Sequence, residues 1–414
     1  MARAAGRQNR GYPGMSQTSI DPRSLRAPPK RPIRLSWSDE RVRGIFWQVV
    51  VVGIVVSIVW WLWSNTVHNL EVRRIATGFG FLGREAGLPI AESIIDYNPT
   101  NSYLRALVVG LLNTLKVAVV GIILATVFGT LIGIARLSKN WVLRTLSATY
   151  VEVIRDLPLL LQLLFWYAIL QGLPGPRQAI HPAEGVFLSN RGLKLPWIEW
   201  EGAHSLALLT FVLGLIATFM YRRQAVAKQI ADGVPRRTWP MALVSLVALP
   251  LAAWAALGAP FTPDIPALRG FNFQGGLTLS PEYFALLAGL VMYTAGFIAE
   301  IVRAGIQAVP NGQREAAQAL GLRPGAVLRL VVLPQALRVI VPPMTSQYLN
   351  ITKNSSLAVA IGYQDIVSIA NTTLNQTGQA IEGIAIIMLV YLTISLSISG
   401  FMNWYNARIA LVER

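Results

Sequence analysis

Nine polar side chains lie close together in the apolar stretch 339–364, and they are the residues best suited to chemistry in this sequence. Asn and Gln amides both donate and accept hydrogen bonds, so the cluster suits the binding of a polar ligand. Pro342 and Pro343 precede the cluster, and we expect them to break the helix and free backbone groups for a ligand. The cluster consists of Thr345, Ser346, Gln347, Asn350, Thr352, Lys353, Asn354, Ser355 and Ser356.

No group of residues in the sequence has the spacing of a catalytic or metal site. The three histidines, His68, His181 and His204, are scattered, and the chain contains no cysteine. The phosphate-binding pattern G-x-x-x-x-G-K-[ST] is absent from the sequence. We therefore expect no catalytic residue, no bound metal and no cofactor on this chain.

Residues 300–338 carry a second signal, a pattern that predicts an element moved by a partner protein rather than a site that binds a small ligand. Asn311 can cap a helix, the residues after it are good helix formers, and Gly321 suits a helix C-terminus. Pro324 suits the first turn of a second helix, and we expect Pro334 to end that helix. The predicted structure is a rigid element of two short helices that a soluble partner protein can bind and move.

Both signals lie in a chain with the composition of a membrane protein. Of its residues, 53% are hydrophobic and 14% are charged, whereas a soluble domain has roughly 25% charged residues. A helix needs roughly 20 apolar residues to cross a bilayer, and eight stretches qualify. The fold class is therefore an all-α polytopic membrane protein with spans at 45–63, 117–135, 157–172, 204–221, 238–263, 283–299, 339–364 and 383–406.

The distribution of positive charge predicts which side of the membrane each loop occupies. With eight spans, both termini share a side, and the loops on that side carry 25 Lys and Arg against 7 on the other. Both termini are therefore expected in the cytoplasm by the positive-inside rule. The net charge of +16 then reflects loops that face anionic lipid, and no nucleic-acid partner is needed to explain it. Segment 1–44 is expected to be a flexible basic tail, or alternatively a docking arm.

The second signal resembles the EAA loop of importer-type ATP-binding-cassette (ABC) permeases. The matching residues have the family's order and spacing, with Val331 in place of the family's Ile. Residues 110–138, 150–167 and 342–362 resemble three core helices of the polar amino-acid permeases. The residues that resemble the EAA motif are Glu315, Ala316, Ala317, Gly321, Val331, Leu333 and Pro334.

This resemblance implies a five-helix core that is enlarged to eight helices, as in the bacterial general L-amino-acid permeases. The expected segments are a tail (1–44), an extra N-terminal span (45–64), a periplasmic segment (65–104), an N-terminal half of the permease core (105–172), an insertion with two spans (173–282) and a C-terminal half of the core (283–414), which contains the coupling loop 300–338.

The resemblance also implies a mechanism and partners. An ABC ATPase dimer, which holds ATP and Mg²⁺, would pull on the 311–334 element and drive alternating access. A periplasmic amino-acid-binding protein would deliver the substrate, and a second, related permease would complete the path across the bacterial inner membrane. Glu315 would accept hydrogen bonds from the ATPase, while Ala316 and Ala317 would let the helix lie deep in a groove.

We expect the substrate path to be lined by polar groups of two spans, because such groups usually face an aqueous cavity. Lys353 could attract a carboxylate, or it could extend outward to lipid headgroups. The alternative function is an ion-coupled secondary amino-acid transporter, although no internal repeat supports it. The substrate's identity and the choice between a homodimer and a heterodimer stay open. The expected path residues are Gln162, Ser346, Gln347, Asn350, Lys353 and Ser355.

Overall fold

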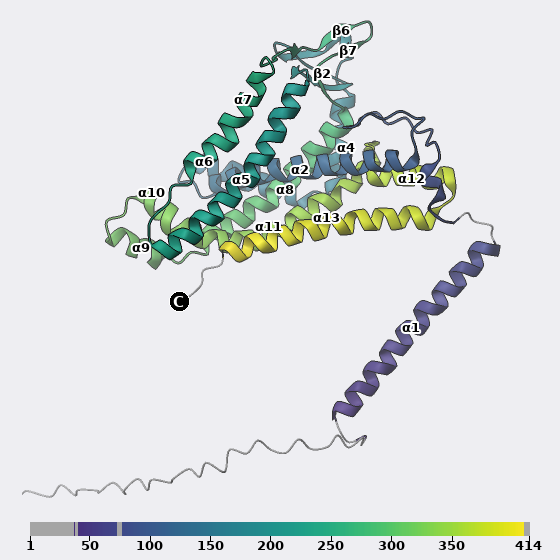
Figure 1. The fold of residues 1–414 in the computed structure, drawn as a ribbon, viewed down its shortest axis with the longest axis horizontal. Coiled ribbons are helices and arrows are strands. Elements are labelled where there is room, and N and C mark those ends of the chain that lie inside the picture. Colours follow the sequence, from purple (N-terminus) through teal and green to yellow (C-terminus); the bar gives the residue numbers. More distant parts are fainter. Residues whose placement is uncertain (1–36, 38–39, 73–76, 410–414) are drawn as a thin grey trace, which may run out of the picture. The chain divides into compact units, whose positions relative to one another are not determined.

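The computed structural model describes residues 37, 40–72 and 77–409 (Figure 1). The chain divides into two compact units, residues 1–74 and 75–414. The first unit contains helix α1, Glu40–Val72, which starts within the segment expected to be a tail. Apart from residue 37, the rest of that expected tail lies outside the described residues. Nearly every described side chain of α1 is exposed within its own unit, so that unit does not cover the apolar surface of the helix.

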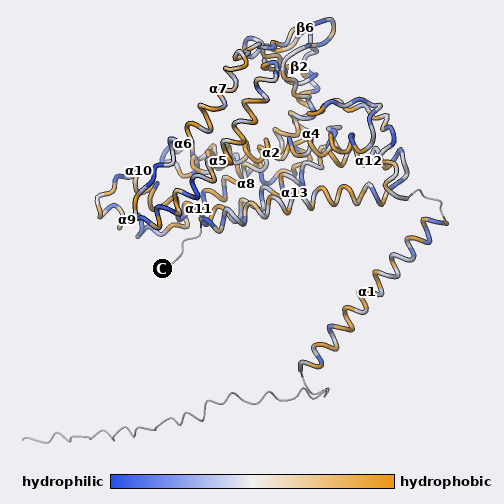
Figure 2. The backbone as a smooth tube through the Cα atoms, viewed as in Figure 1, coloured by the Kyte–Doolittle hydropathy of each residue, from blue (hydrophilic) through white to orange (hydrophobic). Residues whose placement is uncertain are grey.

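The second unit is mainly a helical bundle, and the expected number of membrane spans is confirmed. Across both units the described residues contain seven helices, α1 among them, that are long and apolar enough to cross a membrane, or eight if one bent pair counts as a span. Figure 2 shows the apolar residues running along these helices. The α-helices of the second unit, including those too short to cross a membrane, are α2 (Tyr103–Ala135), α3 (Trp141–Asp156), α4 (Leu159–Gln171), α5 (Gly202–Asp232), α6 (Trp239–Leu243), α7 (Leu249–Ala256), α8 (Pro281–Gln307), α9 (Asn311–Ala319), α10 (Pro324–Val327), α11 (Leu333–Asn354), α12 (Ile366–Thr377) and α13 (Ala380–Ile409).

Shorter helical segments connect or extend these helices. Two of them, η4 (Val244–Ala248) and η5 (Leu328–Val332), are π-helical and keep neighbouring α-helices continuous. Three are 3-10 helices: η2 (Phe79–Gly83), η3 (Pro176–Gln178) and η6 (Ser355–Ile361).

Helices α2 and α8 form the centre of the bundle. They pack closely because two glycines, four residues apart on α2, leave room for α8. Gly129 lies against Ile298, and Gly133 lies against the carbonyl of Ala299 and the side chain of Val302. A Cβ atom at Gly129 would lie 2.6 Å from the Cβ of Ile298, so even alanine does not fit without movement.

The third expected span is sharply bent. Helices α3 and α4 meet at 105°, so the stretch 157–172 contributes only the 13 residues of α4 after the bend. Pro158 lies at the start of α4, and the residue before a proline is disfavoured in helical conformation, which explains the break at Leu157.

The insertion contains short β-strands as well as the two expected spans. The spans are α5 and the continuous series α6, η4 and α7, which together form an antiparallel helical hairpin. The strands lie at one end of this hairpin (Figure 1). They form a four-stranded antiparallel sheet in the order β1–β2–β3–β8 and the two pairs β4–β5 and β6–β7. Their bounds are β1 (Ile180–Ala183), β2 (Val186–Ser189), β3 (Gly192–Leu195), β4 (Trp197–Ile198), β5 (Pro263–Asp264), β6 (Ala267–Arg269), β7 (Asn272–Gln274) and β8 (Leu277–Leu279).

We predict that Gly129→Ala combined with Gly133→Ala separates α2 from α8. Overpacking of a tight core contact typically costs about 1–3 kcal/mol, so the thermal unfolding temperature in detergent should fall. Gly400→Ala is the matched control, because no atom outside its own helix lies within 4 Å of an added Cβ there. Equal unfolding temperatures for the double variant and the control would contradict the close packing.

Candidate coupling element and polar face of α11

The candidate coupling element, residues 311–334, begins three residues after α8 ends. Its first helix, α9, starts at Asn311 itself, and Pro310 occupies the capping position. The expected cap by the Asn311 side chain is therefore wrong, because a residue already inside the helix cannot cap it. On α9 the side chain of Ala317 is buried against the bundle, whereas Glu315 and Ala316 are exposed.

The turn after α9 has the predicted form. Gly321 has a φ of +76°, a left-handed conformation that suits glycine because it has no Cβ. The amide of Leu322 donates to the carbonyl of Ala317, which closes the end of the helix. The turn leaves Leu320 with 82% of its surface exposed, so this apolar side chain points away from the bundle.

The second half of the element differs from the expectation. Pro324 starts α10 as predicted, but Pro334 does not end a helix, because α10, η5 and α11 form one continuous rod. Pro334 lies in the first turn of α11, directly after the wider π-helical turn, where a missing N–H is tolerated. Val331 packs against the core, whereas Leu333 and Pro334 are exposed.

Polar contacts fix this element to the centre of the bundle. The guanidinium of Arg314 on α9 donates to the carbonyl of Ile306 near the end of α8, at 2.9 Å. Almost two turns further back, the carboxylate of Glu300 accepts from Arg303 and from Arg136 at the end of α2. Arg314 therefore connects α9 to the end of α8, and the contacts of Glu300 connect α8 to the end of α2.

Helix α11 presents a polar face. Ser346, Asn350 and Lys353 are exposed, and their spacing of four and three residues places them on one side of the helix. Gln347 is half-buried beside them. The expected break at Pro342 and Pro343 is wrong, because α11 continues through both prolines. The α-helical conformation ends instead at Asn354, where the 3-10 helix η6 begins.

Two other expected path residues have structural contacts. Gln162 is buried, and its amide donates to the carbonyls of Ile154 at 2.9 Å and Leu157 at 3.1 Å. These carbonyls belong to α3 and the bend that follows it, so Gln162 satisfies backbone groups that the bend leaves free. Ser355 is fully buried, and its hydroxyl donates to the carbonyl of Thr352.

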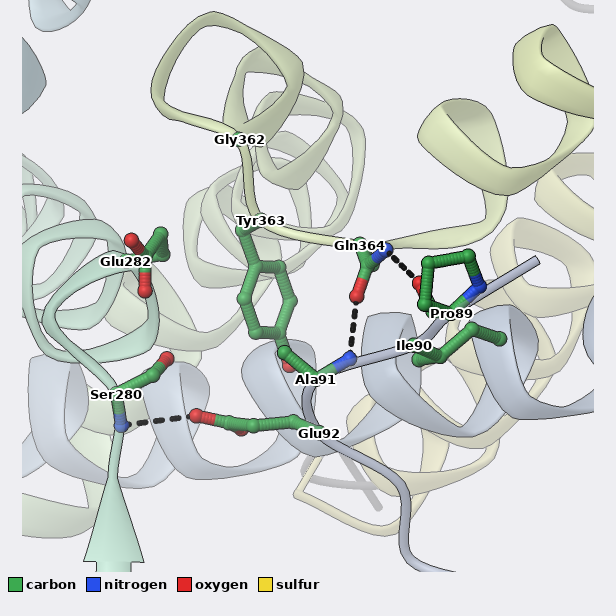
Figure 3. A pocket seen from close by; sticks show the side chains of 9 residues that line it. All are labelled: Pro89, Ile90, Ala91, Glu92, Ser280, Glu282, Gly362, Tyr363 and Gln364. Carbon is green, nitrogen blue, oxygen red and sulfur yellow. Dashed lines mark hydrogen bonds between the residues drawn. The ribbon is translucent and has the colours of Figure 1, made fainter. Parts of the chain in front are cut away.

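A pocket of about 360 Å³ lies at the opposite end of α8, where the segment before α2 meets α8 and the loop after η6 (Figure 3). The side-chain amide of Gln364 donates to the carbonyl of Pro89 and accepts from the amide of Ala91. Glu92 accepts from the amide of Ser280 at 2.9 Å and forms a 3.0 Å ion pair with Lys116 of α2. These contacts hold four separate segments of the chain in one arrangement.

Comparison of the sequence with known proteins shows the family of this chain. Residues 237–411 match the family described as "Binding-protein-dependent transport system inner membrane component". Over 382 residues the chain is 54% identical to YhdX of Escherichia coli (strain K12), an amino-acid ABC transporter permease by name, and the match covers 92% of this chain and 97% of that protein. The chain belongs to the amino-acid ABC transporter permeases.

Two further relatives match the permease over nearly its whole length. The "General L-amino acid transport system permease protein AapQ" of Rhizobium johnstonii is 48% identical over 382 residues, which is 92% of this chain and 96% of that protein. The "Glutamate/glutamine/aspartate/asparagine transport system permease protein BztB" of Rhodobacter capsulatus is 44% identical over 422 residues, which is 94% of this chain and 99% of that protein. The alternative expectation of an ion-coupled secondary transporter is therefore wrong.

The network around the pocket was not predicted, although the permease sequence carries a signal for it. Asn113 and Lys116 are polar residues within the apolar run of α2, and such residues need partners inside a membrane protein. The Asn113 amide donates to the carbonyls of Glu92 and Gln364, both at 2.9 Å. Because Asn113 and Lys116 have partners, the helix can include them: α2 begins at Tyr103, where the Ser102 side chain caps it, well before the expected start at 117.

Asp365 is the residue directly after Gln364 in the sequence, and it is fully buried. One of its carboxylate oxygens accepts from the amide of Ser368 at 2.8 Å and so caps α12. Burial raises the pKa of Asp365 to about 6, although the amide of Ser368 opposes this rise. Burial also raises the pKa of the neighbouring Tyr363 hydroxyl, and the charge of Glu92 adds to this effect.

We predict that Asp365 makes the permease less stable as the pH rises. Between its ordinary pKa of 3.8 and about 6, the folded protein holds a proton that the unfolded chain has released, so stability falls through this window and is constant above it. The loss is about 3 kcal/mol for a shift of about two units. Asp365→Asn keeps the cap and removes the titration. The difference in unfolding temperature between wild type and variant should therefore grow from pH 4 to pH 7, and a difference independent of pH would contradict the assignment.

Proposed function

We propose that this permease forms a share of the translocation path of an ATP-driven importer of amino acids in the bacterial inner membrane. The observation that carries the proposal is the geometry of residues 311–334. The element exposes Glu315, Ala316 and Leu320 while it is fixed to α8 and continuous with α11. A surface built in this way can bind a separate subunit and transmit its movement to the bundle.

The partner at this surface is proposed to be an ABC ATPase dimer. The sequence lacks a phosphate-binding loop, so ATP and Mg²⁺ are assigned to that partner and this chain is proposed to bind no cofactor. The exposed carboxylate of Glu315 can accept charge-assisted hydrogen bonds from arginine or backbone groups. Ala316 is small enough to let the helix approach a groove, and Leu320 adds an apolar anchor that the family motif does not include.

The positive-inside rule supports an orientation in which this element and both termini face the cytoplasm. The β layer and the pocket of Figure 3 then face the periplasm. Strand β8 ends at Leu279, and α8 starts two residues later and runs for 27 residues, or about 40 Å, to the coupling element. A binding protein that docks on the periplasmic side would thus act on the same helix as the ATPase.

The polar face of α11 is the proposed wall of the substrate path. A charged or amide side chain is costly against lipid, so Ser346, Asn350 and Lys353 should face water or another protein. In this single chain the face is exposed, which suits a path between this permease and a second, related permease. Polar L-amino acids are the proposed substrates because the names of AapQ and BztB specify amino acids.

The coupling surface can be tested by purifying the transporter with all subunits co-expressed. We expect Glu315→Arg to reduce the amount of ATPase subunit that co-purifies by at least about tenfold, which corresponds to about 1.4 kcal/mol of binding free energy. Gln313→Arg adds a positive charge at another exposed position of α9 and should have little effect. Full retention of the ATPase by the Glu315 variant would contradict the proposed surface.

The path can be tested separately by uptake of labelled glutamate and glutamine into vesicles. Asn350→Leu should lower the uptake rate about tenfold or more and leave ATPase co-purification unchanged, because it alters only the wall of the path. Thr393→Leu, which changes an exposed polar residue of α13, is the control. Lys353→Gln distinguishes the two roles of that lysine, since uptake falls only if its charge faces the path.

A further inference from the structure

Helix α5 extends well beyond the level at which α6, the start of its antiparallel partner, begins. The two helices are aligned by a close contact between Gly214 and the backbone of Ser245, and by a 2.6 Å hydrogen bond between Thr218 and Ser245. One turn from this contact lie Arg222 on α5 and Met241 on α6, so Arg222 and Trp239 are at nearly the same level. From there α5 continues to Asp232, about 15 Å further.

The extension and the return segment carry almost only positive charge. Residues 222–239, here called the hairpin tip, contain five basic residues and one acidic residue. Asp232 is that acidic residue, and it forms a 3.1 Å ion pair with Arg236. Figure 2 shows this end of α5 as hydrophilic. The basic residues are all exposed, and they are Arg222, Arg223, Lys228, Arg236 and Arg237.

Four of these charges lie where the apolar spans end. Arg222 and Arg223 directly follow the apolar stretch of α5, and Arg236 and Arg237 lie just before α6. The guanidinium of Arg223 lies 5.0 Å from the centre of the Phe219 ring, so it is directed back toward the span. Arg222, Arg223 and Arg237 therefore lie near the level of Trp239, at the depth where phospholipid headgroups surround a membrane protein, whereas Arg236 is directed to Asp232 at the far end of α5.

Large apolar side chains are exposed beside these charges. Ile230 has 81% of its surface exposed and Trp239 has 62%. Tryptophan is favoured at the interface between the hydrocarbon core and the headgroups, and exposed apolar side chains next to Lys and Arg are typical of segments that bind a membrane surface. In water this combination would be unfavourable, whereas in an interface both kinds of side chain are satisfied.

We propose that the hairpin tip binds anionic phospholipid headgroups, with Arg222, Arg223 and Arg237 as the phosphate ligands and Trp239 in the interface. Helix α5 starts just after β4 and α8 just after β8, so both begin at the β layer and end on the same side of the bundle. The lipid site thus lies on the membrane side that carries the coupling element. This proposal depends on the location of the chain in a membrane and does not depend on which substrate the permease transports.

The test uses the complete transporter in nanodiscs that contain phosphatidylcholine with a quarter phosphatidylglycerol. Native mass spectrometry counts the lipids that stay bound when the particles are released. The variant Arg222→Gln, Arg223→Gln, Arg237→Gln removes the charge and keeps a polar side chain at each position. The matched control replaces the same three residues by Lys, and a second control changes Lys139 and Arg144 to Gln, between the end of α2 and the first turn of α3, where the expected orientation is the same.

We expect bound phosphatidylglycerol to fall at least about fivefold in the Gln variant and to stay within about twofold of wild type in both controls, since each basic residue near an anionic surface contributes to binding. Equal phosphatidylglycerol in the Gln variant and wild type would overturn the proposal. Loss of the ATPase subunit from the Gln variant in phosphatidylcholine alone would also overturn it, because the tip would then be a subunit contact. Neither result requires transport, so a failure here is separate from a failure of the proposed function.

Discussion

The close contact between α2 and α8 is the interaction on which the rest of the described structure depends. It is possible because Gly129 and Gly133 leave no side chain between the helices. The same two helices are connected by polar contacts near both ends. Near one end Glu92 joins Lys116 of α2 to Ser280 at the start of α8, and near the other end Glu300 of α8 pairs with Arg136 of α2. The pair therefore behaves as one rigid frame.

This frame gives the other elements their positions. At one end of α8 the chain continues directly from β8, and at the other end Arg314 ties α9 to the last turn of the helix. Helix α11 packs on α8 and carries the polar face with Asn350. A movement of α9 can therefore reach the polar face through two routes, the rigid frame and the continuous rod of α10, η5 and α11. Coupling at a distance needs such contiguous packed elements.

A second constraint is that polar groups inside a membrane protein must find partners within the protein. The bend between α3 and α4 frees two carbonyls, and Gln162 binds both. Asn113 donates to two carbonyls from segments far apart in the sequence. Ser346, Asn350 and Lys353 are different, because they are polar and exposed. This contrast, rather than polarity alone, marks the α11 face as the proposed path.

The sequence by itself determined the class of the protein, the number of spans, and the helix and glycine turn that begin the proposed coupling element. These features depend on local properties: the length of apolar runs, the conformation that Gly321 permits, and the order of residues from Glu315 to Pro334. Four features were decided only by the tertiary structure. They are the contacts of Gln162, the unbroken helix at Pro342 and Pro343, the strands of the insertion and the network around Glu92. Each depends on which distant group meets a given side chain or carbonyl. A helix continues through a proline where the surrounding structure tolerates the loss of one backbone hydrogen bond. A side-chain amide can line a path only where its N–H groups are not already bonded to backbone carbonyls.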